Sequence, residues 1–215
     1  MDQTYAPPDL PLRVVFHDPH LLVLDKPEGL LSVPGKGAHL ADCLISRAQV
    51  QFPAALLVHR LDRDTSGVIV FALTRAAQRA LSLQFELRQM KKVYVATVWG
   101  QVAQKTGHID LPVGVDWPNR PLQHIDRENG RPAQTDWRVV RHGQTTTRLR
   151  LMPLTGRSHQ LRVHMQAIGH PILGDPFYAT GAARDAPRLM LHAESLRLRH
   201  PDSGTALTFS APCPF

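Results

Sequence analysis

The spacing of apolar residues along the chain predicts more strands than helices. Residues 13–16 and 21–27, which are rich in Val, Leu and Phe, flank an Asp-Pro turn and predict a hairpin. Residues 67–73 (GVIVFAL) form a continuous apolar run, which is typical of a strand covered on both faces. Further strands are expected at 91–100, 133–142, 145–154, 189–200 and 205–212.

Helical patterns lie between these strands. Residues 41–50 have a helical composition, and residues 158–168 predict a helix that ends at Gly169. Thr74 is a candidate N-cap for a third helix, whose apolar residues recur at four-residue spacing: Ala77, Leu81 and Phe85. Together the elements predict an α+β fold with a mixed, mostly antiparallel sheet flanked by helices.

The length of the chain and the places of its loops indicate one domain. The 215 residues suffice for one sizeable core, divided into two lobes. Residues 1–12 are polar and proline-rich and predict a flexible lead-in, whereas residues 105–132 predict long loops around a short hairpin. Because no repeat or linker interrupts the rest, we expect a single domain over residues 13–215.

Charge narrows the class of partner. The net charge is +7, and 20 of the 25 basic residues are Arg. Guanidinium groups bind phosphates and stack on bases, so this bias favours a nucleic-acid partner, although genomic composition is an alternative source of arginine. The start does not resemble a signal peptide, and no apolar run reaches the ~20 residues of a spanning helix. We therefore expect a cytoplasmic protein without a membrane partner.

Two familiar kinds of site are excluded by spacing. Gly29 and Gly35 are separated by five residues where a phosphate-binding loop needs four, and Gly37 stands where that loop needs Ser or Thr. His159 and His164 are five residues apart, which places them on different faces of a helix. The two cysteines lie far apart and form no metal-binding pair. No cofactor or metal is expected.

The segment HRLDRDTSG, residues 59–67, is the strongest candidate site. Its carboxylate, Asp62, stands just before the buried strand at 67–73, which would hold the acid at a defined place. Arg162 follows Leu161, a member of the apolar stripe of the helix at 158–168, and should emerge at the edge of the packed face. Its guanidinium would then orient a buried carboxylate and lower the pKa of that group.

Four segments in order identify a family resemblance. HRLDRDTSGVIVFAL, KKVYVATVWG, GRSHQLRVHMQAIGHPILGD and LMLHAESL together resemble the RluA family of RNA pseudouridine synthases, from about Val14 to Pro212. The resemblance implies the pseudouridine synthase catalytic fold and an isomerase that converts a flipped-out uridine to pseudouridine in RNA. Many family members also carry an N-terminal S4 domain, for which this chain has no room.

The resemblance also implies roles for individual residues. Asp62 matches the catalytic carboxylate, Arg162 its basic partner, and Tyr94 the aromatic residue that stacks on the flipped uracil. Leu191 matches the apolar wall opposite that tyrosine, although it reads equally well as a core leucine. Whether the carboxylate attacks the sugar, attacks the ring or removes a proton stays open.

Residues around the carboxylate and on basic strands are candidates for contact with RNA. His59 and Arg60 flank the proposed pocket, and Arg60 would contact phosphates or fill the space that the flipped nucleotide leaves. The other candidates for the backbone-binding track are Lys91, Lys92, Arg148, Arg150 and Arg157, each of which is equally compatible with a solvated cationic face.

Partners and alternatives follow from the same reasoning. One member of the family that shares DWPNRP and GRPAQT acts on both tRNA and large-subunit rRNA, so both stem-loops are expected substrates, bound by a monomer. A synthase with a single RNA site and a non-catalytic RNA-binding relative are alternatives. A glycosidic hydrolase is another; it would need a second carboxylate, for which Asp64 is the local candidate.

Overall fold

The computed structural model describes residues 5–215, which form two compact units. Among the described residues, the first unit comprises residues 5–91 and Ala193–Pro214, and the second comprises Lys92–His192 with Phe215. Of the predicted lead-in, residues 1–4 lie outside the described part of the chain. In the part of the lead-in that the structure describes, the Tyr5 hydroxyl donates to the Asp42 carbonyl at 2.9 Å, so residue 5 is already attached to the first unit.

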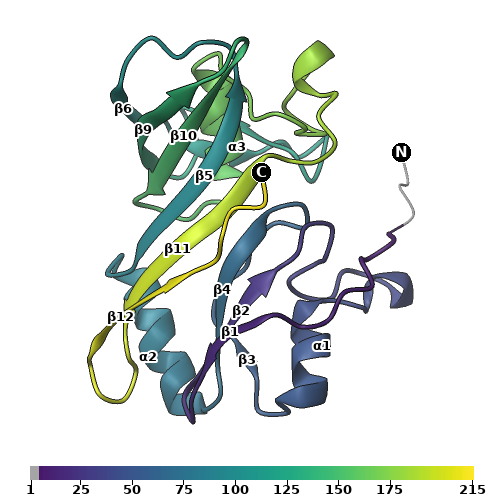
Figure 1. The fold of residues 1–215 in the computed structure, drawn as a ribbon, viewed down its shortest axis with the longest axis vertical. Helices are drawn as coiled ribbons and strands as arrows, with labels where there is room; N and C mark the ends of the chain where they lie inside the picture. The colour runs from purple at the N-terminus through teal and green to yellow at the C-terminus, as the bar shows by residue number, and fades with distance from the viewer. Residues whose placement is uncertain (1–4) are drawn as a thin grey trace. The chain divides into compact units, whose positions relative to one another are not determined.

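The first unit is a sheet covered by helix α2 (Figure 1). Its strands run in the order β1-β2-β4-β11, with β3 on β4 and β12 on β11. Every residue of β2 and β4 is buried, as the apolar run at 67–73 predicts. The bounds are β1 Val14–His17, β2 Leu21–Lys26, β3 Leu56–Leu57, β4 Ser66–Ala72, β11 Leu191–Arg199, β12 Ala206–Ser210, α1 Leu44–Gln51 and α2 Arg75–Glu86.

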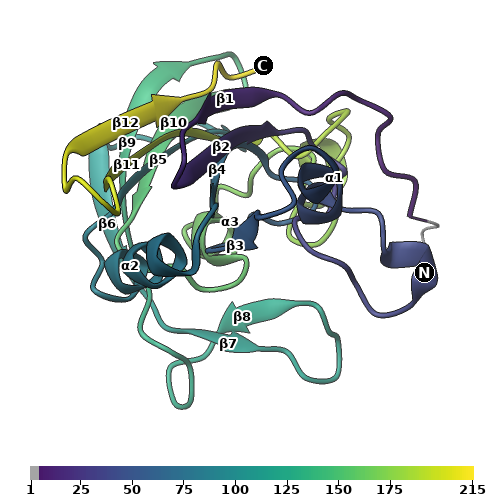
Figure 2. The same ribbon diagram turned by 90° about the horizontal axis from the view of Figure 1, so that it is seen from below.

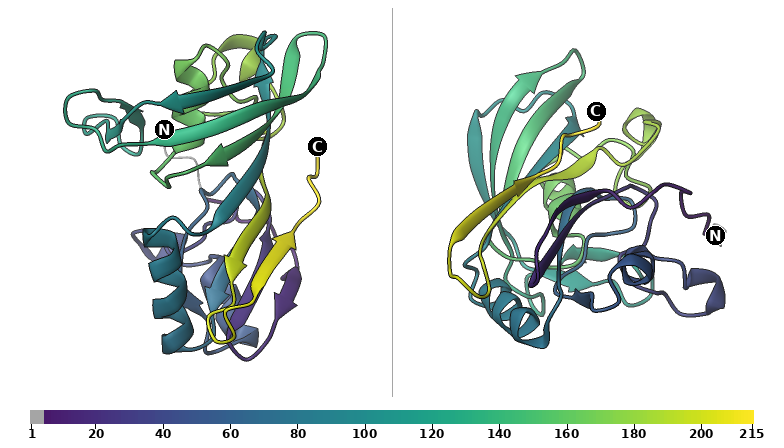
Figure 3. Two further views of the ribbon diagram at one scale, coloured as in Figure 1. Left: turned by 90° about the vertical axis from the view of Figure 1, so that its left-hand side faces the viewer. Right: turned by 60° about the horizontal axis from the view of Figure 1, so that its bottom comes forward.

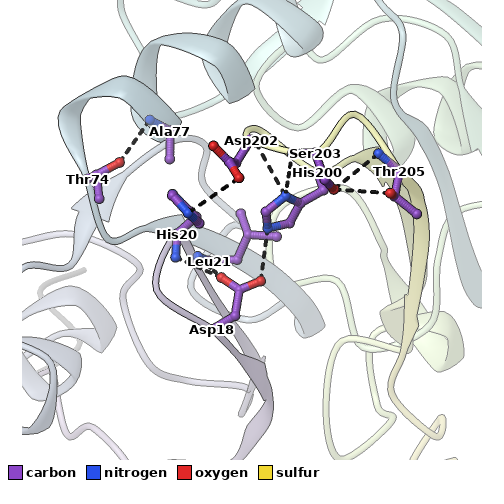
Figure 4. Close-up of polar contacts among 9 residues, drawn as sticks. All are labelled: Asp18, His20, Leu21, Thr74, Ala77, His200, Asp202, Ser203 and Thr205. Atoms are coloured by element: carbon purple, nitrogen blue, oxygen red, sulfur yellow. Dashed lines mark hydrogen bonds and ion pairs between the residues drawn. The ribbon is translucent and has the colours of Figure 1, made fainter.

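Helix α2 begins where the sequence predicts. The Thr74 hydroxyl accepts a hydrogen bond from the Ala77 N–H at 3.1 Å, which satisfies one of the N–H groups at the start of the helix (Figure 4). Ala77 and Leu81 then pack against the sheet, and Phe85 lies at the edge of the same core. The predicted apolar stripe is therefore confirmed.

Two hairpin turns of the first unit meet at a histidine (Figure 4). The Asp18 carboxylate caps the β1–β2 turn through the N–H groups of His20 and Leu21, at 2.7 and 2.8 Å, and accepts a hydrogen bond from His200 Nε2 at 2.9 Å. Partial burial raises the pKa of Asp18, but these hydrogen bonds outweigh it and leave that pKa below its usual value. The ionised carboxylate therefore joins the β1–β2 turn to the turn between β11 and β12.

The second unit is an antiparallel sheet of order β5-β10-β9-β6, with helix α3 and a separate hairpin, β7–β8. Leu161 and Met165 of α3 pack against β5 and β10 in one core, as the predicted stripe requires, and Ile168 lies at its edge. Gly169 follows the helix with φ +83°, which confirms the predicted left-handed end. The bounds are β5 Lys91–Trp99, β6 Thr106–Asp110, β7 Val113–Val115, β8 Gln123–Ile125, β9 Gln134–His142, β10 Thr146–Pro153 and α3 Gln160–Ala167.

A buried histidine ties α3 to the loop after β6. His164 is fully buried, its Nδ1 lies 2.9 Å from the Thr135 hydroxyl, and its Nε2 lies 2.9 Å from the Leu111 carbonyl. Because a carbonyl can only accept, Nε2 carries the proton and Nδ1 accepts from Thr135. Burial lowers the pKa of His164, so the ring is neutral in the folded protein.

Two 3₁₀ turns complete the described elements, at Ala38–Leu40 and Gly181–Ala183. The α+β architecture and the largely antiparallel pairing agree with the prediction, and the two units correspond to the two predicted lobes. No helix within residues 5–215 has the length and apolar character that a crossing of a lipid bilayer requires.

Candidate active site

The loop that carries Asp62 is held through the backbone of its two neighbours. The Ser32 hydroxyl donates to the Leu61 carbonyl at 2.7 Å and accepts from the Leu61 N–H at 3.1 Å. On the other side, Lys26 Nζ donates to the Arg63 carbonyl at 2.7 Å. Ser32 and Lys26 are both buried, while Asp62 itself is half-buried. The main chain is thus fixed on each side of the carboxylate.

The Lys26 ammonium is an unusual anchor because it is fully buried. It also donates to the Pro27 carbonyl at 2.7 Å, so carbonyl oxygens replace part of its hydration. The Thr65 N–H donates to the Asp62 carbonyl at 3.2 Å and closes a turn immediately after the acid. Sequence reasoning missed Lys26 and Ser32, although KPEGLLS precedes the site as a conspicuous polar break between apolar runs.

Two residues beside Asp62 have different surroundings. His59 Nε2 accepts a hydrogen bond from the Val70 N–H at 3.1 Å, and its ring lies 4.5 Å from that of Phe85. This histidine therefore binds the start of the loop to β4. Arg60 is exposed, as contact with a phosphate would require. Their proposed places at the substrate stay predictions.

Arg63 and Asp64 form an ion pair with each other. Arg63 Nε lies 2.7 Å from Asp64 Oδ1, and Arg63 Nη2 lies 3.1 Å from Oδ2. The side chains are 32% and 22% exposed, so water screens the attraction. Because the Asp64 carboxylate is already paired with Arg63, it is poorly suited to be the second carboxylate that a hydrolase needs.

In the second unit, Arg162 is held by its side chain. Its Nε and Nη2 atoms each lie 2.7 Å from an oxygen of Asp175, which gives a bidentate pair. The side chains are 2% and 0% exposed. Asp175 Oδ1 also accepts from the N–H groups of Phe177 and Tyr178, at 2.9 and 3.1 Å. The rings of both aromatic residues lie 5.1–5.2 Å from the guanidinium carbon.

As predicted, Arg162 does not point into bulk water, and its guanidinium binds a buried carboxylate, that of Asp175. It is more deeply buried than the predicted position at the edge of the packed face. The arginine is 2% exposed because the segment after α3 returns across it and supplies Asp175, Phe177 and Tyr178. Helical periodicity shows only which residues face the sheet, and it does not show what covers the rest of the helix. Sequence reasoning also missed Asp175, which stands in the final GD of the family-like segment GRSHQLRVHMQAIGHPILGD.

Tyr94 and Leu191 belong to the core of the second unit. Tyr94 on β5 pairs with Leu151 on β10 and packs, half-buried, against the cluster that contains Leu191. Leu191 is 3% exposed, so it is a core leucine whatever else it contacts. Asp62 belongs to the first unit and Tyr94, Arg162 and Leu191 to the second, so their joint action stays a prediction.

The basic residues proposed for the RNA track differ in their environment. Arg148 and Arg150 alternate with the buried Leu149 and Leu151 along β10, as predicted. Because Leu151 shares a sheet face with its partner Tyr94, the two arginines lie on the opposite face from that tyrosine. A track that includes both faces would have to pass around the sheet.

Three other members of the proposed track lie on or after β5 and β10. Lys91 is exposed. Lys92 Nζ donates to the Thr155 carbonyl at 2.9 Å, and Arg157 Nε donates to the Pro132 carbonyl at 3.1 Å. Lys92 and Arg157 therefore also stabilise the protein, whereas Lys91 has the exposure that a phosphate contact needs.

Comparisons with known proteins identify the class. Residues 20–167 match the family described as RNA pseudouridylate synthase, and the chain belongs to this family. The match includes Asp62, Tyr94 and Arg162 and excludes Leu191. The chain is therefore an RNA pseudouridine synthase, an isomerase that acts on uridine in RNA.

Individual relatives narrow the class to the RluA family. The chain is 54% identical over 216 residues to the dual-specificity RNA pseudouridine synthase RluA of Escherichia coli O6:H1, covering 99% of each chain. It is 50% identical to the protein of the same name from Vibrio vulnificus, covering 98% of this chain and 87% of that one. The predicted RluA family is confirmed.

Solved structures support the fold. The human RNA pseudouridylate synthase domain containing 1 protein superposes with a TM-score of 0.80 at 31% identity, over 95% of this chain and 84% of the other. The human domain containing 4 protein gives a TM-score of 0.75 at 26% identity, over 94% and 88%. The pseudouridine synthase fold predicted from the sequence is confirmed.

Proposed function

We propose that Asp62 is the catalytic carboxylate of this synthase, with Arg162 as its basic partner and Tyr94 as the residue that stacks on the uracil. The observation that carries the proposal is the backbone clamp around Asp62, which fixes both neighbouring peptide groups and leaves the carboxylate itself half-buried. A reacting group benefits from such preorganisation, because misplacement by about 1 Å lowers rates by ~100-fold.

The reaction needs a carboxylate but no net change in composition. The glycosidic bond from N1 of the uracil to C1′ of the ribose breaks, the base rotates, and C5 forms the new bond to C1′. The proton on C5 is released and N1 gains one. Asp62 would act at the sugar or at the ring, and Tyr94 would hold the detached base by stacking. A base within a duplex is inaccessible, so the uridine must be flipped out.

The roles of Leu191, His59 and Arg60 belong to the same proposal. Leu191 would form the apolar wall opposite Tyr94. Arg60, which is exposed, would contact phosphate or occupy the gap left by the flipped uridine. His59 supports the pocket by holding the start of the Asp62 loop on β4.

The assignment is tested with single variants on a tritiated RNA substrate. Asp62→Asn should bind RNA but release no tritium, whereas Asp64→Asn, which changes a neighbouring carboxylate, should retain turnover. Arg162→Met should lower kcat more than affinity. Normal product from Asp62→Asn would discard the assignment, and free uracil in place of pseudouridine would identify a hydrolase.

For the substrates, we propose both a tRNA anticodon loop and a 23S rRNA hairpin. The support is similarity to relatives named as dual-specificity enzymes, over 99% of the chain. Pseudouridines are mapped in tRNA and 23S rRNA from cells with and without the protein. Loss of one pseudouridine in each RNA is expected, and loss in only one class would identify a synthase with a single target.

We further propose that the protein acts as a monomer in the cytoplasm, where these RNAs reside. The support is that one chain supplies all of the proposed catalytic residues. Sedimentation at catalytic concentrations should give the mass of one chain, 24.0 kDa. The mass of a dimer would contradict the proposal.

A further inference from the structure

The Ser32 hydroxyl makes two hydrogen bonds of the kind that the backbone of a neighbouring strand would normally make. It is 3% exposed and bonds to both backbone groups of Leu61, at 2.7 and 3.1 Å. In an antiparallel ladder, two bonds of this kind come from the backbone of a facing residue. Here one side chain supplies both, immediately before Asp62.

Loss of that hydroxyl would leave a buried N–H and a buried carbonyl without this partner. A buried polar group that stays unsatisfied is destabilising, so the loop would relax toward water or another partner. Lys26 would still hold the Arg63 carbonyl on the far side of Asp62. The predicted result is a shift of the acid, while the sheet of the first unit is retained.

We propose that Ser32 is a positioning residue that sets the location of the Asp62 carboxylate through the backbone of Leu61. The proposal rests on the proposed function of Asp62. Because Ser32 acts on the reacting group and not on RNA affinity, its removal lowers kcat and leaves KM nearly unchanged. A displacement of about 1 Å corresponds to a loss of up to ~100-fold.

The test compares Ser32→Ala and Ser32→Cys with Thr74→Ala. The Cys variant keeps the size of the side chain but weakens both hydrogen bonds, so it preserves folding. Thr74→Ala removes one hydroxyl-to-backbone bond from the same unit, away from the Asp62 loop. We expect kcat to fall in the order Ser, Cys, Ala, by 10- to 100-fold for Ala, with KM within about twofold; Thr74→Ala should keep the wild-type kcat.

The outcomes separate this inference from the proposed function. If Asp62→Asn is inactive but both Ser32 variants keep the wild-type kcat, Ser32 does not position the acid and only this inference fails. If Thr74→Ala lowers kcat as much as Ser32→Ala does, the loss reflects general destabilisation of the unit, Ser32 is merely structural and this inference fails. Full activity of Asp62→Asn overturns the proposed function itself.

A second feature, the turn at the end of the β7–β8 hairpin, points to RNA on different grounds. Figures 2 and 3 show this hairpin projecting from the rest of the second unit. Trp117 in the turn is 65% exposed, and the guanidinium carbon of Arg120 lies 3.9 Å from the centre of its ring. The arginine covers one part of the indole, and much of the ring surface stays in water.

The turn itself is well ordered by hydrogen bonds. Asn119 Nδ2 donates to the Asp116 carboxylate at 3.0–3.1 Å, and the Asp116 N–H donates to the Leu122 carbonyl at 3.0 Å. Asp116 is thus occupied in building the turn, while Trp117 and Arg120 are presented at its surface. A large apolar ring held this way exposes surface that a ligand would bury.

The base of the hairpin is attached to the start of α3. The Gln123 N–H donates to the Tyr178 hydroxyl at 2.9 Å, and that hydroxyl lies 2.7 Å from His159 Nδ1. Val113 and Val163 pack with Tyr178 in a small core. The turn therefore has a defined position relative to Arg162, which lies on α3 in the same unit.

We infer that Trp117 stacks on an unpaired base of the RNA substrate, with Arg120 beside a phosphate. RNA is the occupant that fits because the chain belongs to a family that modifies RNA and carries a net charge of +7. Stacking on an aromatic side chain contributes about 1–3 kcal/mol per base, which is about 5- to 150-fold in affinity. Trp117 would increase affinity for a looped RNA without taking part in the reaction.

This inference is tested with Trp117→Ala, Trp117→Phe and the control Val140→Ala, which removes another exposed apolar side chain of the same unit. Binding of unmodified tRNA and of 23S rRNA fragments is measured, together with kcat. We expect Trp117→Ala to weaken binding of at least one RNA by 5- to 150-fold with kcat unchanged. Phe should restore part of the loss. Wild-type affinity of Trp117→Ala for both RNAs would overturn the inference.

Discussion

The two units hold their candidate catalytic residues in different ways. In the first unit, Ser32 and Lys26 hold the main chain on each side of Asp62 and leave the carboxylate half-buried. In the second unit, Asp175 holds the guanidinium of Arg162 directly, and both side chains are almost fully buried. One unit fixes a backbone and the other fixes a side chain.

The difference follows from the side chains involved. Aspartate has a short side chain, so fixing its backbone nearly fixes its oxygens. Arginine has a long flexible side chain, and only contacts at the guanidinium itself can orient it. Because Asp175 binds Nε and Nη2, the orientation of the third nitrogen is also set. The comparison predicts that the two units will respond differently to substitution.

The largest effects are expected at two glycines that allow close approach of backbones. A Cβ on Gly67 would overlap the Ala193 carbonyl oxygen, and one on Gly174 would overlap that of Arg188. Gly67→Ala and Gly174→Ala should each lower the free energy of unfolding by about 4–5 kcal/mol or prevent folding. Denaturant titration measures the loss.

Matched controls exist for both glycines. Gly204 in the first unit and Gly169 in the second have φ of +70° and +83°, and a Cβ there would meet nothing within 4 Å. Their Ala variants should lose only the ~1–2 kcal/mol of a left-handed residue. Equal losses at clashing and open positions would show that backbone conformation, and not close approach, determines the effect.

The next largest effect should come from Asp175. Asp175→Asn removes the carboxylate that binds the buried Arg162 guanidinium in a bidentate pair, so the free energy of unfolding should fall by about 3–5 kcal/mol. Asp64→Asn breaks the bidentate pair with Arg63, which is partly exposed, and should lower the free energy of unfolding by less than about 1 kcal/mol. Denaturant titration measures the loss of unfolding free energy in both variants, and similar losses would contradict the contrast between the units.

Acid should weaken the second unit before the first. The pKa of His164 is lowered by burial, so its stabilisation is present above pH 6.5 and is lost as pH falls below that value, where the unfolded state binds the proton first. Below pH 6.5 the free energy of unfolding should fall by at most ~1.4 kcal/mol per pH unit, and His164→Gln should remove this pH dependence. Asp18, whose pKa is lowered, should weaken the first unit only below pH 3.8.

Hydrogen exchange at pH 7, 5.5 and 3 measures this order. Amides of β9, β10 and α3 should lose protection between the first two pH values, and those of β1 and β2 only at the third. If His164→Gln shows the same loss between pH 7 and 5.5 as the wild type, another group is responsible.

The smallest effect should be on the salt dependence of RNA binding. Lys91 is exposed, and Lys91→Ala should reduce the slope of log affinity against log salt by about 0.7–0.9. Lys92 is bound to the Thr155 carbonyl, so Lys92→Ala should change the slope less and the stability more. An unchanged slope for both variants removes them from the interface.

Local patterns were sufficient to predict most of the elements. The apolar run before residue 73, the cap at Thr74 and the end at Gly169 all depend on neighbouring residues, and each is confirmed. The short strands within residues 105–132 were expected only as loops around a hairpin, because turn residues outnumber apolar ones there.

For the candidate site, too, local sequence patterns and the tertiary structure supplied different information. The sequence by itself determined the order of strands and helices, the basic character and, through its motifs, the family. The same motifs led to the proposal of Asp62, Tyr94 and Arg162 as catalytic residues. Only the tertiary structure showed that Ser32 and Lys26 hold the acid and that Asp175 buries and orients the arginine. Those partners lie 13 to 37 residues away along the chain, where periodicity and capping, which act over a few residues, carry no information.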